Sequence, residues 1–163
     1  MQQTIRLNDD LVIGPQPTPN SLDELQRTGI QSVVNLRETR EPEQPMSPDA
    51  ERREVEERGM FYAHVPISTD SLDQVVIEQL QLHLHQLPKP IYLHSWTGQR
   101  SGIAAALCLA VNHAWSGDET LEHIENLGVE CSEGMARFIR TYVDQRSLGN
   151  GAPPPLDLAP RSQ

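Results

Sequence analysis

Apolar residues along this chain alternate between short β-branched runs and longer stretches with helical periodicity. The short runs predict five strands, the first two forming a small hairpin, over residues 4–7, 11–13, 32–36, 61–67 and 91–94. The amphipathic stretches predict six helices, over residues 22–28, 48–58, 71–87, 100–113, 117–126 and 132–145. Strands that alternate with helices are typical of an α/β fold, so we expect a central, mostly parallel sheet of four to five strands flanked by helices.

The chain has 163 residues, the size of one ordinary domain, and its pattern shows no internal repeat. We expect one domain over residues 1–146 and a flexible tail over residues 147–163, where proline and glycine replace periodic apolar positions. The N-terminal residues lack the basic and apolar regions of a secretory signal, which favours a cytoplasmic location. No apolar run has the length that a membrane span requires.

The net charge of the chain is −10, and Lys89 is its only lysine. Binding to nucleic acid or to an anionic membrane needs clustered cations, so the charge argues against both kinds of partner. Cys108 and Cys131 are too few for a disulfide framework and lie at no metal-binding spacing. We therefore expect two reduced packing cysteines, no metal and no other cofactor.

The most informative segment is His-Ser-Trp-Thr-Gly-Gln-Arg-Ser at residues 94–101, which joins a buried strand to a buried helix. Such a loop gathers unpaired backbone N–H groups, and the helix dipole adds partial positive charge, so the loop is suited to binding phosphate. Gly98 permits a conformation that a β-carbon would obstruct, and Arg100 can direct two N–H groups at phosphate oxygens. The expected phosphate-binding residues are Ser95, Trp96, Thr97, Gly98, Gln99 and Arg100.

Phosphoryl transfer in this loop requires a thiolate at position 95, because a helix N-terminus and nearby cations lower the pKa of a cysteine from its usual value near 8.5. This chain has Ser95 instead. A serine hydroxyl stays protonated near neutral pH without a general base, and the sequence indicates none beside it. We expect Ser101 to hydrogen-bond residue 95. His94 either orients the loop or is an ordinary buried histidine at a strand end.

With cysteine at position 95, residues 94–101 would match the phosphatase motif His-Cys-five residues-Arg-Ser/Thr. Together with residues 13–17, 29–37 and 61–68, they give a chain that resembles the cysteine-dependent, dual-specificity-like protein tyrosine phosphatases, in particular their small bacterial and cyanobacterial branch. The resemblance covers most of residues 4–145. It implies a metal-independent phosphatase that acts on proteins or peptides phosphorylated on tyrosine, serine or threonine.

In that family a cysteine attacks phosphorus, an arginine binds the equatorial oxygens and an aspartate protonates the leaving oxygen. The resemblance implies these roles for position 95, Arg100 and one aspartate. Asp70 and Asp73 both follow the strand over residues 61–67. Asp70 is the favoured acid because it lies in a loop, whereas Asp73 lies in the first helical turn, where a carboxylate interacts favourably with the helix dipole.

Three hypotheses account for Ser95. The favoured one is an inactive Cys-to-Ser variant of a phosphatase, made to trap substrate. The alternative is a natural pseudophosphatase that binds phosphorylated partners without turnover. A rhodanese-like sulfur carrier is the third, although Arg100 and Ser101 at phosphatase spacing count against it.

Residues 37–40 follow a central strand, so their loop should reach the same sheet edge as residues 94–101. This loop either reads the substrate or is a solvated charged connection, and the charges over residues 51–58 are expected to form a solvated helix face. Trp96 and Gln99 are candidates for the wall of a pocket, whereas Trp115 is expected to pack in the interior.

Overall fold

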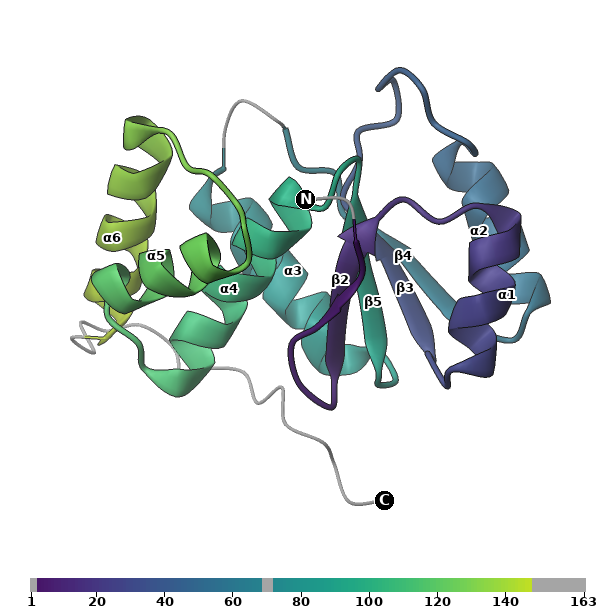
Figure 1. The fold of residues 1–163 in the computed structure, drawn as a ribbon, viewed down its shortest axis with the longest axis horizontal. Helices are drawn as coiled ribbons and strands as arrows, with labels where there is room; N and C mark the ends of the chain where they lie inside the picture. The colour runs from purple at the N-terminus through teal and green to yellow at the C-terminus, as the bar shows by residue number, and fades with distance from the viewer. Residues whose placement is uncertain (1–2, 69–71, 148–163) are drawn as a thin grey trace.

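The computed structural model describes residues 3–68 and 72–147. Its five strands form one sheet in the order β1-β2-β5-β3-β4 (Figure 1). They are β1 (Ile5–Arg6), β2 (Leu11–Pro15), β3 (Ser32–Asn35), β4 (Phe61–His64) and β5 (Ile91–Ser95). β1 runs antiparallel to β2, and the other neighbouring strands are parallel. The predicted α/β fold with a mostly parallel sheet is confirmed.

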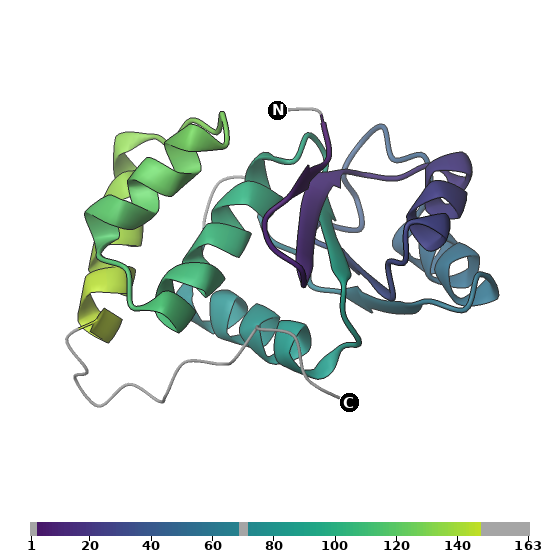
Figure 2. The same ribbon diagram turned by 60° about the horizontal axis from the view of Figure 1, so that its bottom comes forward.

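Helices cover both faces of the sheet (Figures 1 and 2). They are α1 (Pro19–Arg27), α2 (Pro48–Glu57), α3 (Gln74–Gln86), α4 (Gln99–His113), α5 (Gly117–Asn126) and α6 (Glu133–Ser147). α1 and α2 lie on one face, and α3 and α4 lie on the other. α5 and α6 pack against α4 on its side away from the sheet. No helix among residues 3–68 and 72–147 is long and apolar enough to cross a membrane.

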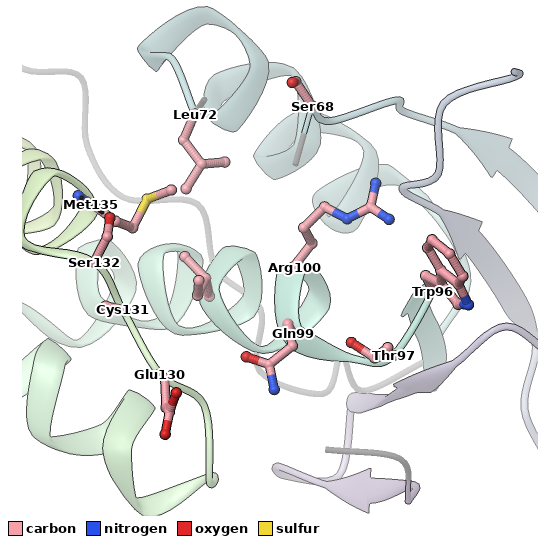
Figure 3. A pocket seen from close by; sticks show the side chains of 11 residues that line it. Ser68, Leu72, Trp96, Thr97, Gln99, Arg100, Glu130, Cys131, Ser132 and Met135 are labelled. Carbon is pink, nitrogen blue, oxygen red and sulfur yellow. Dashed lines mark hydrogen bonds between the residues drawn. The ribbon is translucent and has the colours of Figure 1, made fainter. Parts of the chain in front are cut away.

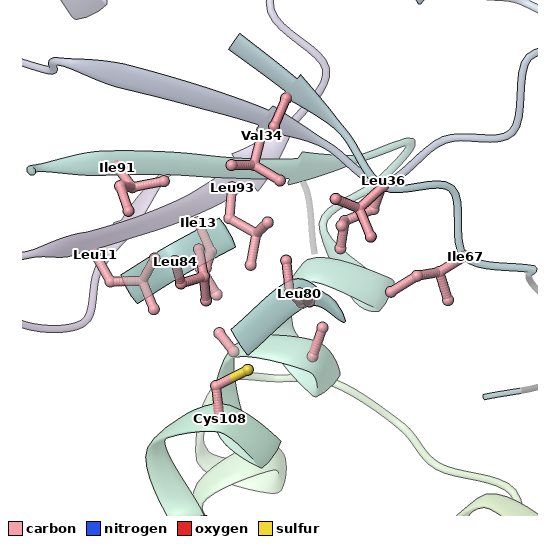
Figure 4. Packing of buried hydrophobic residues seen from close by; sticks show 14 of the residues in the cluster. Leu11, Ile13, Val34, Leu36, Ile67, Leu80, Leu84, Ile91, Leu93 and Cys108 are labelled. Atoms are coloured by element: carbon pink, nitrogen blue, oxygen red, sulfur yellow. The ribbon is translucent and has the colours of Figure 1, made fainter. Parts of the chain in front are cut away.

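Central strands are apolar on both faces, which is why they read as continuous runs in the sequence. Ile13, Val34 and Leu93 lie in register on neighbouring strands and pack with Leu80 and Leu84 of α3 (Figure 4). The next residue back along each strand points to the opposite face. These residues, Val12, Val33 and Tyr92, pack with Leu22 of α1 and Val55 of α2.

Two helix starts differ from the prediction by three residues, and those of α4 and α6 differ by one. α1 begins at Pro19, because the side chain of Thr18 accepts a hydrogen bond from the backbone N–H of Ser21 and Pro is well suited to the first helical position. α3 begins at Gln74, so Asp73 is its N-cap and does not lie in its first turn.

The end of the fourth predicted strand, over residues 61–67, also differs. β4 stops at His64, but the chain continues beside β3, since Val65 N–H and Ile67 N–H donate to the carbonyls of Asn35 and Leu36 at 2.9 Å. α6 extends to Ser147, one residue past the predicted domain boundary. Residues 148–163, the predicted tail, lie outside the described residues.

Candidate active site

The predicted anion-binding loop lies where three parallel strands end. Ser95 closes β5 opposite Pro15, the last residue of β2. Gly98 is the N-cap of α4 and has a φ of 95°, which favours glycine as expected. As the N-cap, Gly98 has no side chain to accept the first N–H groups of α4, so those of Gln99 and Arg100 are left for another acceptor. The loop, here called the cradle, comprises residues 95–100.

Ser95 forms the floor of the cradle. It is fully buried, and its Oγ accepts a hydrogen bond from the backbone N–H of Ser101 at 3.2 Å. Ser101 thus hydrogen-bonds residue 95 as expected, through its main chain and not through its hydroxyl. The hydroxyl donates to the carbonyl of Gly98, three residues back in the first helical turn, at 3.0 Å, and lies 3.4 Å from the carbonyl of Gly14 on β2. Ser101 therefore holds the cradle through both its main chain and its side chain.

Arg100 lies beside the cradle with its guanidinium fixed by protein acceptors. Nη1 donates to Glu41 Oε2 at 2.6 Å and to the carbonyl of Ile67 at 2.9 Å, and Nη2 donates to Glu41 Oε1 at 2.7 Å. A guanidinium has five N–H groups. Within the described part of the chain, Nε and the second hydrogen of Nη2 have no partner. These two donors form the side edge of the guanidinium, which suits an oxyanion.

Glu41 is the residue that sequence reasoning missed at this site. Its carboxylate also accepts from Arg37 Nε at 3.0 Å and from the backbone N–H of Glu38 at 2.6 Å. Burial raises the pKa of Glu41, but the hydrogen bonds from Arg100, Glu38 and Arg37 outweigh it, so the pKa lies below its usual value. The loop after β3 thus reaches the cradle as predicted. Its Arg37 is fully buried, so this part of the loop is not solvated.

His94 is paired with a residue of α2, which covers the sheet face opposite α4. Its Nε2 lies 2.5 Å from Glu51 Oε2, and both residues are fully buried. Glu51 belongs to α2, whose charges were expected to face solvent. That expectation is wrong for Glu51 because it lies on the same helix face as the buried Val55.

A cavity of about 390 Å³ opens beside the cradle (Figure 3). Trp96, Thr97, Gln99 and Arg100 line one part of it, which confirms Trp96 and Gln99 as wall residues. The rest of the lining includes Leu72, Ile103, Glu130, Cys131 and Met135. Trp96 is 39% exposed, whereas Trp115 stacks between His113 and His123, away from this cavity.

The two candidate acids differ in what the structure describes. Asp73 Oδ1 accepts the backbone N–H of Val76 at 2.9 Å, so its carboxylate caps α3. Asp70, the favoured acid, lies outside the described residues. Its role stays a prediction.

Neither cysteine lies at the floor of the cradle. Burial raises the pKa of Cys108 to about 12, and burial also raises the pKa of Cys131 on the cavity wall. Both groups are therefore thiols near neutral pH. In residues 3–68 and 72–147, no three His, Cys, Asp or Glu side chains gather closely enough to hold a metal ion.

Comparison with known proteins places this geometry in a family. The phosphatase-like domain of beta-lactamase hydrolase-like proteins matches residues 4–112, more than half of the chain. A beta-lactamase hydrolase-like protein of Xylella fastidiosa is 27% identical over 145 residues, covering 88% of this chain and 32% of that protein. The chain thus spans about a third of the length of the curated relatives it matches.

Solved structures share the fold. A Cys-to-Ser variant of P. aeruginosa TpbA in complex with pTyr has a TM-score of 0.65 and 23% identity, covering 91% of this chain and 90% of that chain. The core catalytic domain of the PP-IP phosphatase SIW14 of S. cerevisiae, in complex with citrate, has a TM-score of 0.68 and 16% identity, covering 90% and 88%. Together with the match over residues 4–112, these findings show that the chain belongs to the phosphatase-like domain family of beta-lactamase hydrolase-like proteins and has the fold of tyrosine-phosphatase-like enzymes.

Proposed function

We propose that the cradle binds the phosphoryl group of a phosphomonoester and that, with cysteine at position 95, the domain hydrolyses it through a phosphocysteine intermediate. One observation carries this proposal: the side edge of Arg100 and the N–H groups that Gly98 leaves uncapped belong to the same helix start, which contacts residue 95 through the N–H of Ser101. Both groups supply N–H donors, and the helix dipole favours an anion at the same point.

The chemistry follows from these positions. A thiolate at position 95 attacks phosphorus, and the S–P bond forms as the bond from phosphorus to the ester oxygen breaks. Asp70 donates a proton to the departing oxygen. Water then attacks phosphorus, the S–P bond breaks, and the Asp70 carboxylate takes a proton from that water. The products are an alcohol or phenol and inorganic phosphate, and Arg100 stabilises charge on the equatorial oxygens in both steps.

We propose an aryl phosphate, such as phosphotyrosine in a protein or peptide, as the preferred substrate. The cavity beside the cradle is lined by Leu72, Ile103 and Met135, which suit a flat apolar group. Among the described residues that line this cavity, Arg100 is the only cation, and Glu130 adds a carboxylate. One cation cannot balance several phosphate groups, and the net charge of −10 repels them further, so polyphosphorylated ligands are disfavoured.

The chain with Ser95 is proposed to bind phosphate without turning it over. Ser95 Oγ already accepts the N–H of Ser101, and no general base contacts it within the part of the chain that the structure describes. An engineered Cys-to-Ser exchange is the favoured origin, and a natural pseudophosphatase is the alternative. The solved complex of a Cys-to-Ser TpbA variant with pTyr supports binding by such a serine form.

The decisive experiment compares the chain with its Ser95→Cys variant. Phosphate release is measured from an aryl phosphate and from phosphotyrosine, phosphoserine and phosphothreonine peptides, without added metal. We expect hydrolysis only with cysteine and fastest with aryl phosphates. Ser95→Cys combined with Arg100→Ala is the control for the cradle.

Equal rates on all three peptides would contradict the aryl preference. If neither protein releases phosphate but both bind phosphopeptide, the pseudophosphatase is favoured. If neither protein releases phosphate or binds phosphopeptide, the proposed phosphate site is overturned.

A further inference from the structure

A continuous chain of hydrogen bonds joins the two ends of the cradle behind its floor. It runs through side chains from five separate parts of the sequence, in the order His94, Glu51, Gln16, Arg37, Glu41 and Arg100. Its first member directly precedes the cradle and its last member closes it. The anion site is therefore framed by one connected polar unit.

Gln16 is the central link. Its Nε2 donates to Glu51 Oε1 and to the carbonyl of Met46, both at 3.1 Å. Its Oε1 accepts from Arg37 Nη1 at 2.5 Å. The half-buried Gln16 follows directly after β2, whose last residue, Pro15, is in register with Ser95. The end of β2 therefore places the Gln16 amide near the end of β5, where the cradle begins.

An amide is the side chain that this position demands. Glu51 and the Met46 carbonyl need a donor, whereas Arg37 has donors only and needs an acceptor. A carboxylate at position 16 would face Glu51 with like charge, and a cation would face Arg37 with like charge. The same reasoning sets the orientation of the amide, with oxygen toward Arg37 and nitrogen toward Glu51.

The charges in this unit balance. Arg37 and Arg100 carry charges opposite to those of Glu41 and Glu51. The side chains of Arg37 and Glu51, which bond Gln16 directly, are 1% and 0% exposed, and that of Glu41, one hydrogen bond further on, is 8% exposed. Arg37 also lies 5.0 Å from the ring centroid of Trp96, on the cavity wall. A change at Gln16 therefore leaves buried charges short of a partner on both sides.

We propose that Gln16 is a positioning residue that couples the His94 and Arg100 ends of the cradle into one pre-organised anion site. This inference rests on the proposed function. The side chain of Gln16 bonds to no cradle residue in the part of the chain that the structure describes, so it acts through Glu51 and Arg37. Pre-organised donors bind an anion without having to be ordered by it, which is why the coupling strengthens binding.

The test measures tungstate binding, as a tetrahedral oxyanion, to the full chain by calorimetry. Gln16→Met keeps the length of the side chain but none of its three hydrogen bonds, and we expect the tungstate Kd to rise about tenfold, the lower end of what loss of an outer partner costs at metal sites. Gln16→Asn keeps the amide but is one methylene too short to span both partners. It should raise the Kd in the same direction by a smaller factor.

A spectroscopic readout separates positioning from simple destabilisation. The ¹⁵N resonance of Arg100 Nε, assigned by its loss in Arg100→Lys, should move in unliganded Gln16→Met at a temperature where the protein is folded. Gln26→Met is the matched control, since Gln26 also donates a hydrogen bond, to the carbonyl of Arg58 at 2.7 Å, but lies on α1. It should change neither the resonance nor the Kd.

If the parent chain binds tungstate and both Gln16 variants bind equally well with an unmoved Arg100 resonance, the coupling is overturned and the proposed function stands. If the parent chain binds no tungstate, the proposed function falls and this inference falls with it. Folded Gln16 variants with weakened binding and a shifted resonance support the proposal.

Discussion

Glu41 binds Arg100 end-on: each carboxylate oxygen accepts from a different terminal nitrogen of the guanidinium, at 2.6 and 2.7 Å, across 59 residues of sequence. This pair takes the end edge of Arg100 and leaves its side edge for a ligand. Glu41 thus orients the arginine, and it also neutralises part of the charge that attracts an anion. We therefore expect anion binding at the cradle to depend on the direction of the arginine donors as much as on charge.

Glu41→Ala should strongly destabilise the fold. The change leaves Arg37, whose side chain is 1% exposed, without its carboxylate partner. Removing one partner of a buried ion pair costs roughly 3–5 kcal/mol. Urea unfolding checks this against Glu24→Ala, which breaks an exposed pair with Arg27 and should cost less than about 1 kcal/mol. Equal losses in the two variants would show that Arg37 is not a buried charge in need of a partner.

Acidification should weaken the fold through the same carboxylate. The pKa of Glu41 lies below its usual value, about 4.3 in an unfolded chain, because hydrogen bonds from Arg100, Glu38 and Arg37 outweigh burial. Its contribution to stability is therefore fully present above that value and is lost as the pH falls through the folded pKa. Between pH 6 and pH 3 the parent should lose more unfolding free energy than Glu41→Gln. Parallel curves for the two proteins would contradict this assignment.

Arg100→Ala should abolish most tungstate binding. The side edge of the guanidinium offers two charge-assisted hydrogen bonds, each worth about 1.5–3 kcal/mol, so the Kd should rise at least about 100-fold. Arg100→Lys keeps the charge but not the planar fork, and it should fall between the parent and the alanine variant. Calorimetry measures all three. A lysine variant as tight as the parent would show that charge alone holds the anion.

Substitutions at Asp70 and Asp73 should have different effects, on turnover for Asp70 and on stability for Asp73. Asp73 caps α3, so Asp73→Ala should cost about 1 kcal/mol of stability and leave turnover of the Ser95→Cys protein near its full value. Asp70→Asn in that background should lower kcat by about 100-fold to 10,000-fold, the usual contribution of proton donation. Steady-state kinetics and thermal unfolding of both variants check the assignment. Full turnover with Asp70→Asn would exclude Asp70 as the acid.

Gly117 of α5 lies against the backbone of Arg140 in α6. A β-carbon at this position would lie 2.6 Å from the Cα of Arg140, a backbone atom that cannot move aside by rotation. Gly117→Ala should therefore cost roughly 1–3 kcal/mol. Gly134→Ala is the control because nothing lies within 4 Å of its β-carbon, and alanine there should stabilise α6 by roughly 0.5–1 kcal/mol. A neutral Gly117→Ala would mean that the two helices separate at little cost.

Local signals were enough for the architecture and the cradle. Runs apolar on both faces predicted the central strands, and the order of strands and helices predicted the parallel sheet. Gly98 and Arg100 were predicted at the cradle because the conformation of a loop and the donors at a helix start depend on neighbours in sequence. The start of α1 was predicted three residues too late. Pro19 was the signal that could have located it, because Pro is well suited to the first helical position.

The partners of the cradle were decided only by tertiary structure. Glu51 and Glu41 stand in charged segments that read as solvated, and the sequence alone offers no reason to bury them. The fold brings Glu51 to His94 across 43 residues and Glu41 to Arg100 across 59. A buried charge is stable only where the rest of the chain supplies its counter-charge and hydrogen bonds. The sequence by itself therefore determined the position of the strand–loop–helix turn that is proposed to bind an anion, and the packing of α2 and of the loop after β3 determined which side chains hold that turn in place.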